Sequence, residues 1–146
     1  MMTNDDTAPV VDLTAEECWE LLDLARFGRL AYLLVDEVHV VPINVVADAG
    51  SLLFRTASGN KLLAAAMHAP VAFEIDWHDD LVAWSVVARG ALRRVPEDEA
   101  HRVDDLELQP WVATVAYDVL ELRPEVVTGR RFRLRRAGSD DEPASR

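Results

Sequence analysis

The chain has 146 residues, half of them hydrophobic and 28% charged, which suffices for one globular domain with a substantial core and is short for two. Its formal net charge of −11 argues against a general nucleic-acid binder. The single cysteine, Cys18, cannot form an internal disulfide, and no apolar run reaches the length of a membrane span. The N-terminus is acidic where a signal peptide is basic, so we expect a cytoplasmic protein with no membrane partner.

The N-terminal part predicts a flexible segment followed by one helix. Residues 1–12 lack periodicity, so we place them outside a domain that spans residues 13–136. Thr14 and Glu17 have the spacing of a capping box. The helix behind it has one apolar stripe, formed by Cys18, Leu21, Leu22 and Ala25. Gly28 stands where a helix C-terminus would be expected, so the helix should end there.

Strand-like alternation follows this helix. Three strands separated by two short turns are expected: 29–35, a turn at 36–37, 38–46, a turn at 48–50, and 51–56. Connections this short predict an antiparallel meander. Pro42 lies inside the second strand, where it cannot donate to a ladder. That position is therefore either an edge or a bulge that faces a ligand.

The stretch from Ser51 to His68 carries the clearest functional signal. A buried strand passes through a small polar turn at Gly59 into a run of strong helix formers that begins at Leu62. Such a turn exposes backbone N–H groups that suit an anion, usually a phosphate. Arg55 and Lys61 bracket the turn with positive charge in an acidic chain. The alternative is an ordinary turn with two solvated cations.

The second half of the chain adds further strands. They are expected at 71–77, 81–95, 112–122 and 130–134, with turns at 78–80 and 124–129, a short helix from Pro96, and a disordered tail at 137–146. Gly90 suggests a bend inside its strand. The arginines of residues 130–136 are interpreted as protection of an edge strand. Six to seven mostly antiparallel strands with two to three helices predict a mainly β fold, a small barrel with attached helices.

Several kinds of chemistry lack their sequence signature. The four histidines do not have the spacing of a metal-ligand set, so no metal site is expected. The G-x-S-x-G motif, the dinucleotide-binding glycine motif and the P-loop are all absent. No side chain demands the role of catalytic acid or base. Trp84 and Trp111 could offer flat surfaces to a ring system.

A series of motifs in a fixed order resembles a known family. The motifs are Ala25–Ala31, Val40–Asn44, Phe54–Lys61, Ala69–Glu74, Trp84–Gly90, Gln109–Trp111 and Val127–Arg131. Together they cover roughly residues 13–135 and resemble the pyridoxamine 5′-phosphate oxidase-like, FMN-binding split-barrel proteins, especially small actinobacterial members.

This resemblance implies a split barrel and a homodimer that holds two flavins at the subunit interface. The cofactor-binding residues that it implies are Val41, Pro42, Ile43, Asn44, Arg55, Thr56, Ser58, Lys61, Trp84, Ser85 and Trp111. The phosphate would be held from Arg55 to Lys61, and the strand of Val41–Asn44 would run beside the isoalloxazine. Trp84 and Ser85 would meet the ring's polar edge or the ribityl chain, and Trp111 would belong to the wall supplied by the other subunit.

The sequence departs from the family pattern in the region that would bind the substrate. Oxidases of this family carry a basic, histidine-containing C-terminal motif, whereas this chain has no histidine after His101. Pyridoxine or pyridoxamine phosphate is therefore not the expected substrate. The expected function is that of an FMN-dependent oxidoreductase of unknown substrate. The alternatives are an F420-dependent reductase and a non-catalytic flavin carrier or cofactor-free dimeric binding protein.

Overall fold

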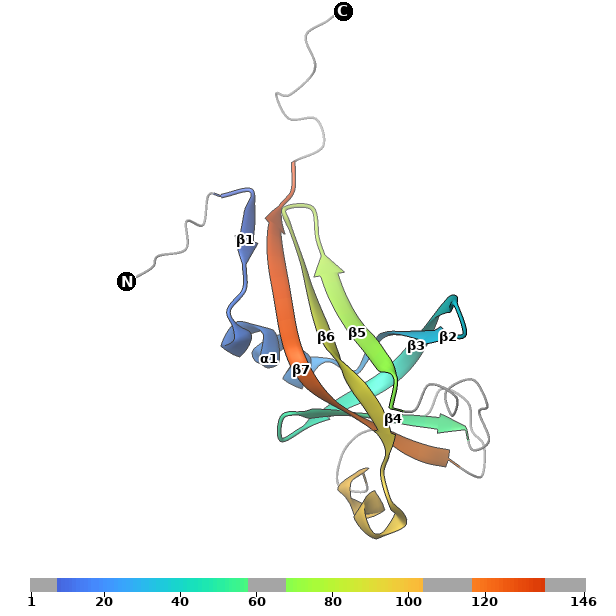
Figure 1. Cartoon of the computed structure of the whole chain (residues 1–146). Helices are drawn as coiled ribbons and strands as arrows, with labels where there is room; N and C mark the ends of the chain where they lie inside the picture. Colours follow the sequence, from blue (N-terminus) through green and yellow to red (C-terminus); the bar gives the residue numbers. More distant parts are fainter. Residues whose placement is uncertain (1–7, 58–67, 104–116, 136–146) are drawn as a thin grey trace, which may run out of the picture.

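The computed structural model describes residues 8–57, 68–103 and 117–135, which form seven strands, one α-helix and one 3-10 helix (Figure 1). In chain order these elements are β1 (Val10–Asp12), α1 (Ala15–Leu24), β2 (Phe27–Leu34), β3 (Glu37–Asp48), β4 (Ser51–Ala57), β5 (Pro70–His78), β6 (Val82–Arg94), the 3-10 helix η1 (Glu97–Val103) and β7 (Tyr117–Arg133). Within these ranges no helix has the length and apolar composition needed to cross a bilayer.

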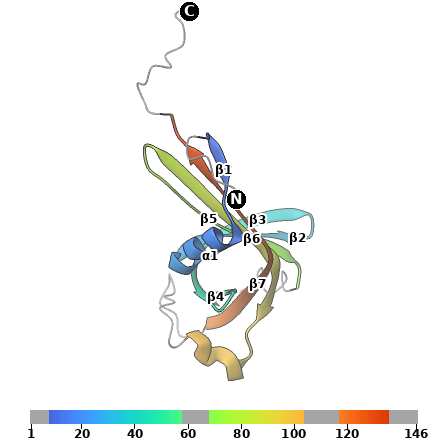
Figure 2. The same cartoon turned by 90° about the vertical axis from the view of Figure 1, so that its left-hand side faces the viewer.

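Six of the strands close into a barrel. The strand order is β1-β7-β4-β3-β2-β5-β6, and β6 pairs back onto β7, so β1 alone stays outside the ring. Closure occurs where Glu121 of β7 lies opposite Leu53 of β4 and opposite Arg93 of β6. All pairings are antiparallel. The mainly β, split-barrel prediction is confirmed, and Figure 2 shows α1 lying across the barrel.

The core fills the inside of this barrel. Alternate residues of each strand point inward, as the pleat requires. Phe54 and Phe73 are fully buried and meet edge to face with their ring centroids 5.2 Å apart. Helix α1 adds Cys18 and Leu22, both fully buried. Its capping box is confirmed, because Thr14 Oγ1 accepts from the Glu17 amide and Glu17 accepts from the Thr14 amide.

The predicted end of α1 at Gly28 is wrong. The helix stops at Leu24, and Ala25 is already extended. Gly28 instead lies inside β2, where a Cβ would stand 2.5 Å from both the Glu74 carbonyl oxygen and the Phe73 ring. Glycine is required there because β5 and a core ring approach the backbone closely. A glycine near a helix end is compatible with both roles, and only the tertiary contact distinguishes them.

The predicted turn at 124–129 and the separate strand after it are also wrong. Strand β7 runs without interruption from Tyr117 to Arg133. Its pairing with β6 shifts register between Arg89 and Gly90, with Gly90 opposite Pro124, which confirms the bend at Gly90. Gly129 is needed for packing, since a Cβ there would lie 2.8 Å from Cys18 Sγ of α1. Pro124 therefore lies at a bulge, and Gly129 allows α1 to pack closely against β7.

Smaller differences concern the ends of elements. Val10–Asp12, which the sequence placed in the flexible N-terminal segment, pair with β7 as strand β1. This pairing puts Arg130–Phe132 between β1 and β6. The prediction that these residues lie in an edge strand is therefore wrong. The first hairpin turns one residue earlier than predicted, at Val35 and Asp36. The turn at Ala49 and Gly50 is confirmed, and both residues have positive φ.

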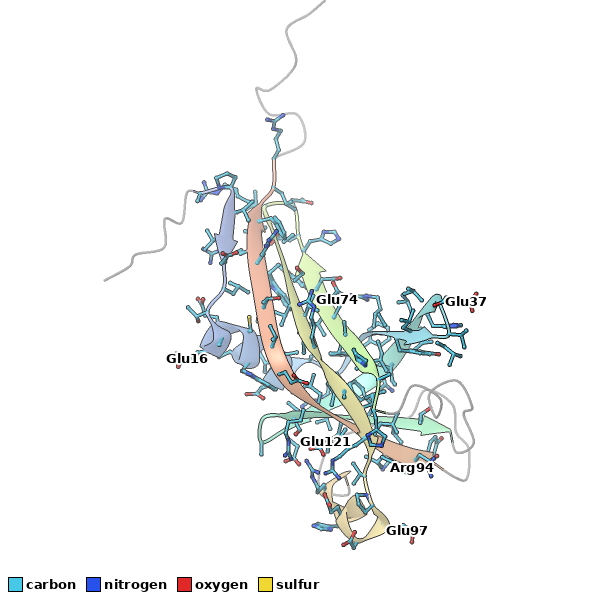
Figure 3. The ribbon with its side chains drawn as sticks, viewed as in Figure 1. Glu16, Glu37, Glu74, Arg94, Glu97 and Glu121 are labelled. Atoms are coloured by element: carbon cyan, nitrogen blue, oxygen red, sulfur yellow. The ribbon has the colours of Figure 1, made fainter. Side chains whose placement is uncertain are left out.

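A buried carboxylate fastens η1 to the barrel. The Glu121 side chain is fully buried on the outside of β7 and accepts from Arg93 Nε at 2.5 Å and from Arg102 Nη2 at 2.9 Å. Arg102 belongs to η1 and also donates to Asp48 of β3 at 2.9 Å. Glu99 of η1 accepts from Arg93 at 3.1 Å and from Arg102 at 3.3 Å. Figure 3 shows Glu121 beside η1 at the lower end of the barrel.

This network controls the ionisation of Glu121. Burial alone would raise the pKa of its carboxyl, but hydrogen bonds from Arg102, Ser51 and Arg93 outweigh that effect and lower the pKa to about 2. The charged form is therefore strongly favoured in the folded protein. A buried charge of this kind stabilises the fold only while its partners remain in place.

We expect Glu121→Gln to lower the free energy of unfolding by about 3 kcal/mol, because it leaves two arginines without their shared buried partner. Urea unfolding of the flavin-free protein at fixed protein concentration measures the change. Glu97→Gln is the matched control. It makes the same chemical change at an exposed position of η1, and we expect an effect below about 0.5 kcal/mol. Equal effects of the two substitutions would show that the network contributes nothing.

The stability difference between wild type and Glu121→Gln should depend on pH. The folded pKa of about 2 lies below the ordinary value of 4.5, so the stabilisation is complete above about pH 4.5 and is lost as the pH falls towards 2. We expect the difference measured at pH 6 to shrink by roughly half or more at pH 3. Urea midpoints at several pH values test this. A difference that stays constant from pH 6 to pH 3 contradicts the assignment.

Candidate functional site

The predicted phosphate-binding cation Arg55 lies on the outside of the barrel, near the end of β4. Its neighbour Phe54 is buried in the core, so strand alternation directs Arg55 outward. The guanidinium carbon lies 5.6 Å from the centroid of the Tyr117 ring on β7, a cation–π contact. Thr56 follows on the inner side. The two adjacent residues therefore leave the strand on opposite faces, and Arg55 is the one on the outside.

The predicted ring-contacting strand is divided in the same way. Val41 and Ile43 pack into the core, whereas Pro42 and Asn44 lie on the outside of β3. Pairing with β4 begins only at Val45. Before that residue, one edge of β3 has no strand partner within the described ranges. Pro42 therefore occupies an edge, which was one of the two possibilities left open by the sequence.

The two predicted residues of β6 also separate. Trp84 packs against the core, whereas Ser85 lies on the outside, opposite Asp76 of β5 and Arg130 of β7. Ser85 borders a groove of about 680 Å³ over the face of β6 and β7, which Asp12 of β1 and Leu13 also line. Ser58, Lys61 and Trp111 lie outside the described residues, so their roles stay predictions. Among the other predicted site residues, the structure brings together four on the barrel exterior: Pro42, Asn44, Arg55 and Ser85.

The sequence missed a charged cluster at the centre of this exterior surface. Arg29 of β2 lies opposite Pro42 on one side and Glu74 of β5 on the other. Its Nε donates to Glu74 Oε1 at 2.9 Å, and its Nη2 donates to Asp76 Oδ2 at 2.5 Å. Figure 3 shows Glu74 along β5. The alternation of Glu74 and Asp76 with the buried Ile75 signals two outward carboxylates, but it does not reveal the arginine between them.

The electrostatics of the cluster are dominated by mutual neutralisation. Hydrogen bonding with Glu74 raises the pKa of Arg29, which stays charged. Burial raises the pKa of Glu74, and the neighbouring Asp76 adds to that effect while Arg29 opposes it. Glu74 therefore takes up a proton more readily than an ordinary glutamate. The cluster places a proton-accepting group next to the strands that carry Pro42 and Ser85.

The exterior arginines differ in how they are neutralised. Carboxylates lie 2.5 to 3.2 Å from four of them: Arg29, Arg93, Arg94 and Arg102. Arg55 and Arg89 have no carboxylate within 4.0 Å in the part of the chain that the structure describes. Arg55 contacts the Tyr117 ring, and Arg89 donates to Thr128 Oγ1 at 3.3 Å. A guanidinium without a carboxylate partner is available to a ligand phosphate or carboxylate.

The exterior between Arg55 and Ser85 has dimensions that suit a flavin mononucleotide. Strands β4, β3, β2, β5 and β6 are successive neighbours. The two residues are therefore separated by four strand spacings, about 19 Å along the surface. This is comparable to an extended FMN. A cation at one end, the free edge of β3 in between and a hydroxyl at the other end fit the groups such a ligand presents.

An apolar area lies beside this surface, here called the hairpin patch and formed by Leu33, Val38, Val40 and Val126. These residues are 50 to 70% exposed. Leu33 pairs with Val38 across the β2–β3 hairpin, and Val40 pairs with Ala31. A groove of about 580 Å³ is lined by Leu33, Val38 and Val126, by small residues such as Ala31 and Ala72, and by Arg89. Exposed apolar side chains that gather in this way mark an interaction surface.

Comparisons with known proteins agree with this architecture. Residues 14–131 match the family model described as pyridoxamine 5′-phosphate oxidase. A Corynebacterium glutamicum structure described as a candidate pyridoxamine 5′-phosphate oxidase is 36% identical, with a TM-score of 0.77 over 88% of this chain and 97% of that one. The FAD-binding protein from Mycobacterium smegmatis is 38% identical, with a TM-score of 0.74 over 85% of this chain and 99% of that one.

A curated relative extends the match along the sequence. An uncharacterized protein of Mycobacterium tuberculosis strain H37Rv is 30% identical over 130 residues, which cover 84% of this chain and 86% of that protein. The family model accounts for the capped helix and for every strand from β2 to β6, together with nearly all of β7. The chain therefore belongs to the pyridoxamine 5′-phosphate oxidase-like split-barrel family.

Proposed function

We propose that this protein binds a flavin on the exterior of the barrel and acts as a flavin-dependent oxidoreductase, with FMN as the expected cofactor. The observation that carries the proposal is Arg55, a cation without a described carboxylate partner near the end of β4, just before the stretch from Ser58 to Lys61 that the sequence predicts to be a phosphate-binding turn. The Mycobacterium smegmatis relative, at 38% identity, is described as FAD-binding, which supports a flavin in general.

Each exterior residue would have a defined task. Arg55 would hold the cofactor phosphate, together with Ser58 and Lys61 of the predicted turn. The segment of β3 at Pro42 and Asn44 would border the ring system, and Ser85 would offer a hydroxyl to its polar edge. A bound flavin supplies the electron transfer, and the protein supplies position, polarity and exclusion of water. The Arg29–Glu74–Asp76 cluster would set the charge beneath the ring.

We further propose a homodimer in which a second copy of the chain covers the hairpin patch. Four exposed apolar side chains, three of which line one groove, are unfavourable in water and would be buried by association. The flavin would then lie between two barrel exteriors.

Titration of the purified protein with FMN, riboflavin, FAD and F420, followed by absorbance and fluorescence, tests cofactor binding. We expect FMN to bind. We expect Arg55→Gln to weaken the binding of FMN by about tenfold or more, and to change the affinity for riboflavin little, because riboflavin lacks the phosphate. Arg94→Gln is the control, because this exposed arginine is already paired with Asp118.

The outcomes separate the candidate functions. Preferential F420 binding with F420H2-driven turnover would indicate an F420-dependent reductase. Flavin binding without turnover by NAD(P)H or F420H2 would indicate a carrier. Absence of binding to all four ligands at high micromolar concentration would contradict the flavin proposal. An equal loss of FMN and riboflavin in Arg55→Gln would remove Arg55 from the phosphate site.

Substitution of a patch residue by lysine tests the dimer. We expect Val38→Lys to convert the protein to monomers in sedimentation velocity experiments, because a charge would have to be buried in the interface. Leu24→Lys is the control, since Leu24 is exposed at the end of α1, away from the patch. A wild-type protein that is monomeric at micromolar concentration, or an unchanged dimer of Val38→Lys, would contradict the proposal.

A further inference from the structure

We propose that the groove over the face of β6 and β7, bordered by Asp12 of β1 and by Leu13, is a second anion-binding subsite, which accepts the carboxylate or phosphate of a small-molecule ligand other than the cofactor phosphate at Arg55. Anion binding in this groove does not require flavin. It rests on the proposed function only where the ligand is taken to be a substrate of the bound flavin.

The register of the two strands builds the groove. Ser85 lies opposite Arg130, and Val87 lies opposite Thr128. Paired residues point to the same face, so all four side chains rise on the barrel exterior. Arg89 stands next along β6 and donates to Thr128 Oγ1 at 3.3 Å. The resulting space of about 680 Å³ lies within the range typical of small-molecule sites.

The charged groups of the groove favour an anion. Arg89 has no carboxylate partner among the residues that the structure describes. The described carboxylate nearest to Arg130 is Asp12 at 3.8 Å, and the two side chains are 65% and 88% exposed, so this contact is weak. The groove is lined by two guanidinium groups, by the hydroxyls of Ser85 and Thr128 and by one carboxylate, that of Asp12, so positive charge exceeds negative charge there. This set of donors recognises a carboxylate or a phosphate.

The backbone places Arg89 at an irregularity of the strand. The register shift of the β6–β7 ladder falls between Arg89 and Gly90. Bulges bend a strand and re-aim the side chains beside them, and they occur frequently next to binding sites. A Cβ on Gly90 would lie 2.8 Å from the Arg123 carbonyl oxygen, so the bulge depends on glycine. The position from which Arg89 leaves the strand therefore depends on this bulge.

The groove is too far from Arg55 to share one phosphate with it. Arg55 of β4 lies opposite Val119 of β7, and Arg89 of β6 lies opposite Val126 of the same strand. Seven residues of strand correspond to about 23 Å. This exceeds the reach of a guanidinium side chain by a wide margin. The two cations consequently serve two separate anionic groups.

Titration of the flavin-free, ¹⁵N-labelled protein with inorganic pyrophosphate tests the subsite by chemical-shift mapping. We expect saturable shifts of the backbone amides of Ser85, Val87, Arg89, Thr128 and Arg130. Arg89→Gln and Arg130→Gln should each weaken binding about tenfold. Arg94→Gln, an exposed arginine of the same strand that is paired with Asp118, should leave these shifts unchanged. Thermal unfolding of each variant verifies that it is folded.

Three results would overturn the proposal. The first is an absence of localised shifts in this groove, or shifts that Arg89→Gln leaves intact. The second is a loss of FMN affinity in Arg89→Gln as large as that in Arg55→Gln, which would make the groove part of the cofactor site. The third is dissociation of a dimer by Arg89→Gln without any pyrophosphate effect, which would assign the cation to the partner subunit. Because pyrophosphate binding is measured without flavin, failure of flavin binding leaves the result interpretable.

Discussion

The barrel is closed by a short segment of β7 whose residues pair with β4 on one side and with β6 on the other. At Leu120, Glu121 and Leu122, β7 is hydrogen-bonded to β4 on one side and to β6 on the other. This closure encloses the apolar core, since Leu120 and Leu122 point inward. It also turns Glu121 outward into the arginine network that attaches η1. The core, the 3-10 helix and the exterior surface all depend on this short segment.

The distribution of charge follows from the same geometry. In a chain with a net charge of −11, carboxylates are abundant enough to neutralise every exterior arginine. Several arginines are indeed held between two acids, as Arg29 is by Glu74 and Asp76. Arg55 and Arg89 instead contact an aromatic ring and a hydroxyl. Neutral partners leave most of their charge available to a ligand, which distinguishes binding cations from structural ones.

Local signals in the sequence predicted most of the elements but few of their contacts. The capping box at Thr14, the strands around Pro42 and the bend at Gly90 depend on neighbouring residues, so the sequence revealed them. Gly28 and Gly129 were misread because their role is to admit Phe73 and Cys18 from distant segments. The Arg29–Glu74 pair joins residues 45 positions apart. The division of the predicted site between the inner and outer faces required the register of the closed barrel.

The uninterrupted course of β7 restricts how such a barrel can diverge. One half of this strand is paired with β4, and the other half lies between β6 and β1, so its register is fixed from both ends. Adding or removing one residue between Leu122 and Gly129 would exchange the inner and outer side chains of one half relative to the other. β7 already carries one extra residue, Glu125, at the bulge opposite Arg89 and Gly90, so any further change of length there requires a second bulge. The hairpin turns can change length without this constraint.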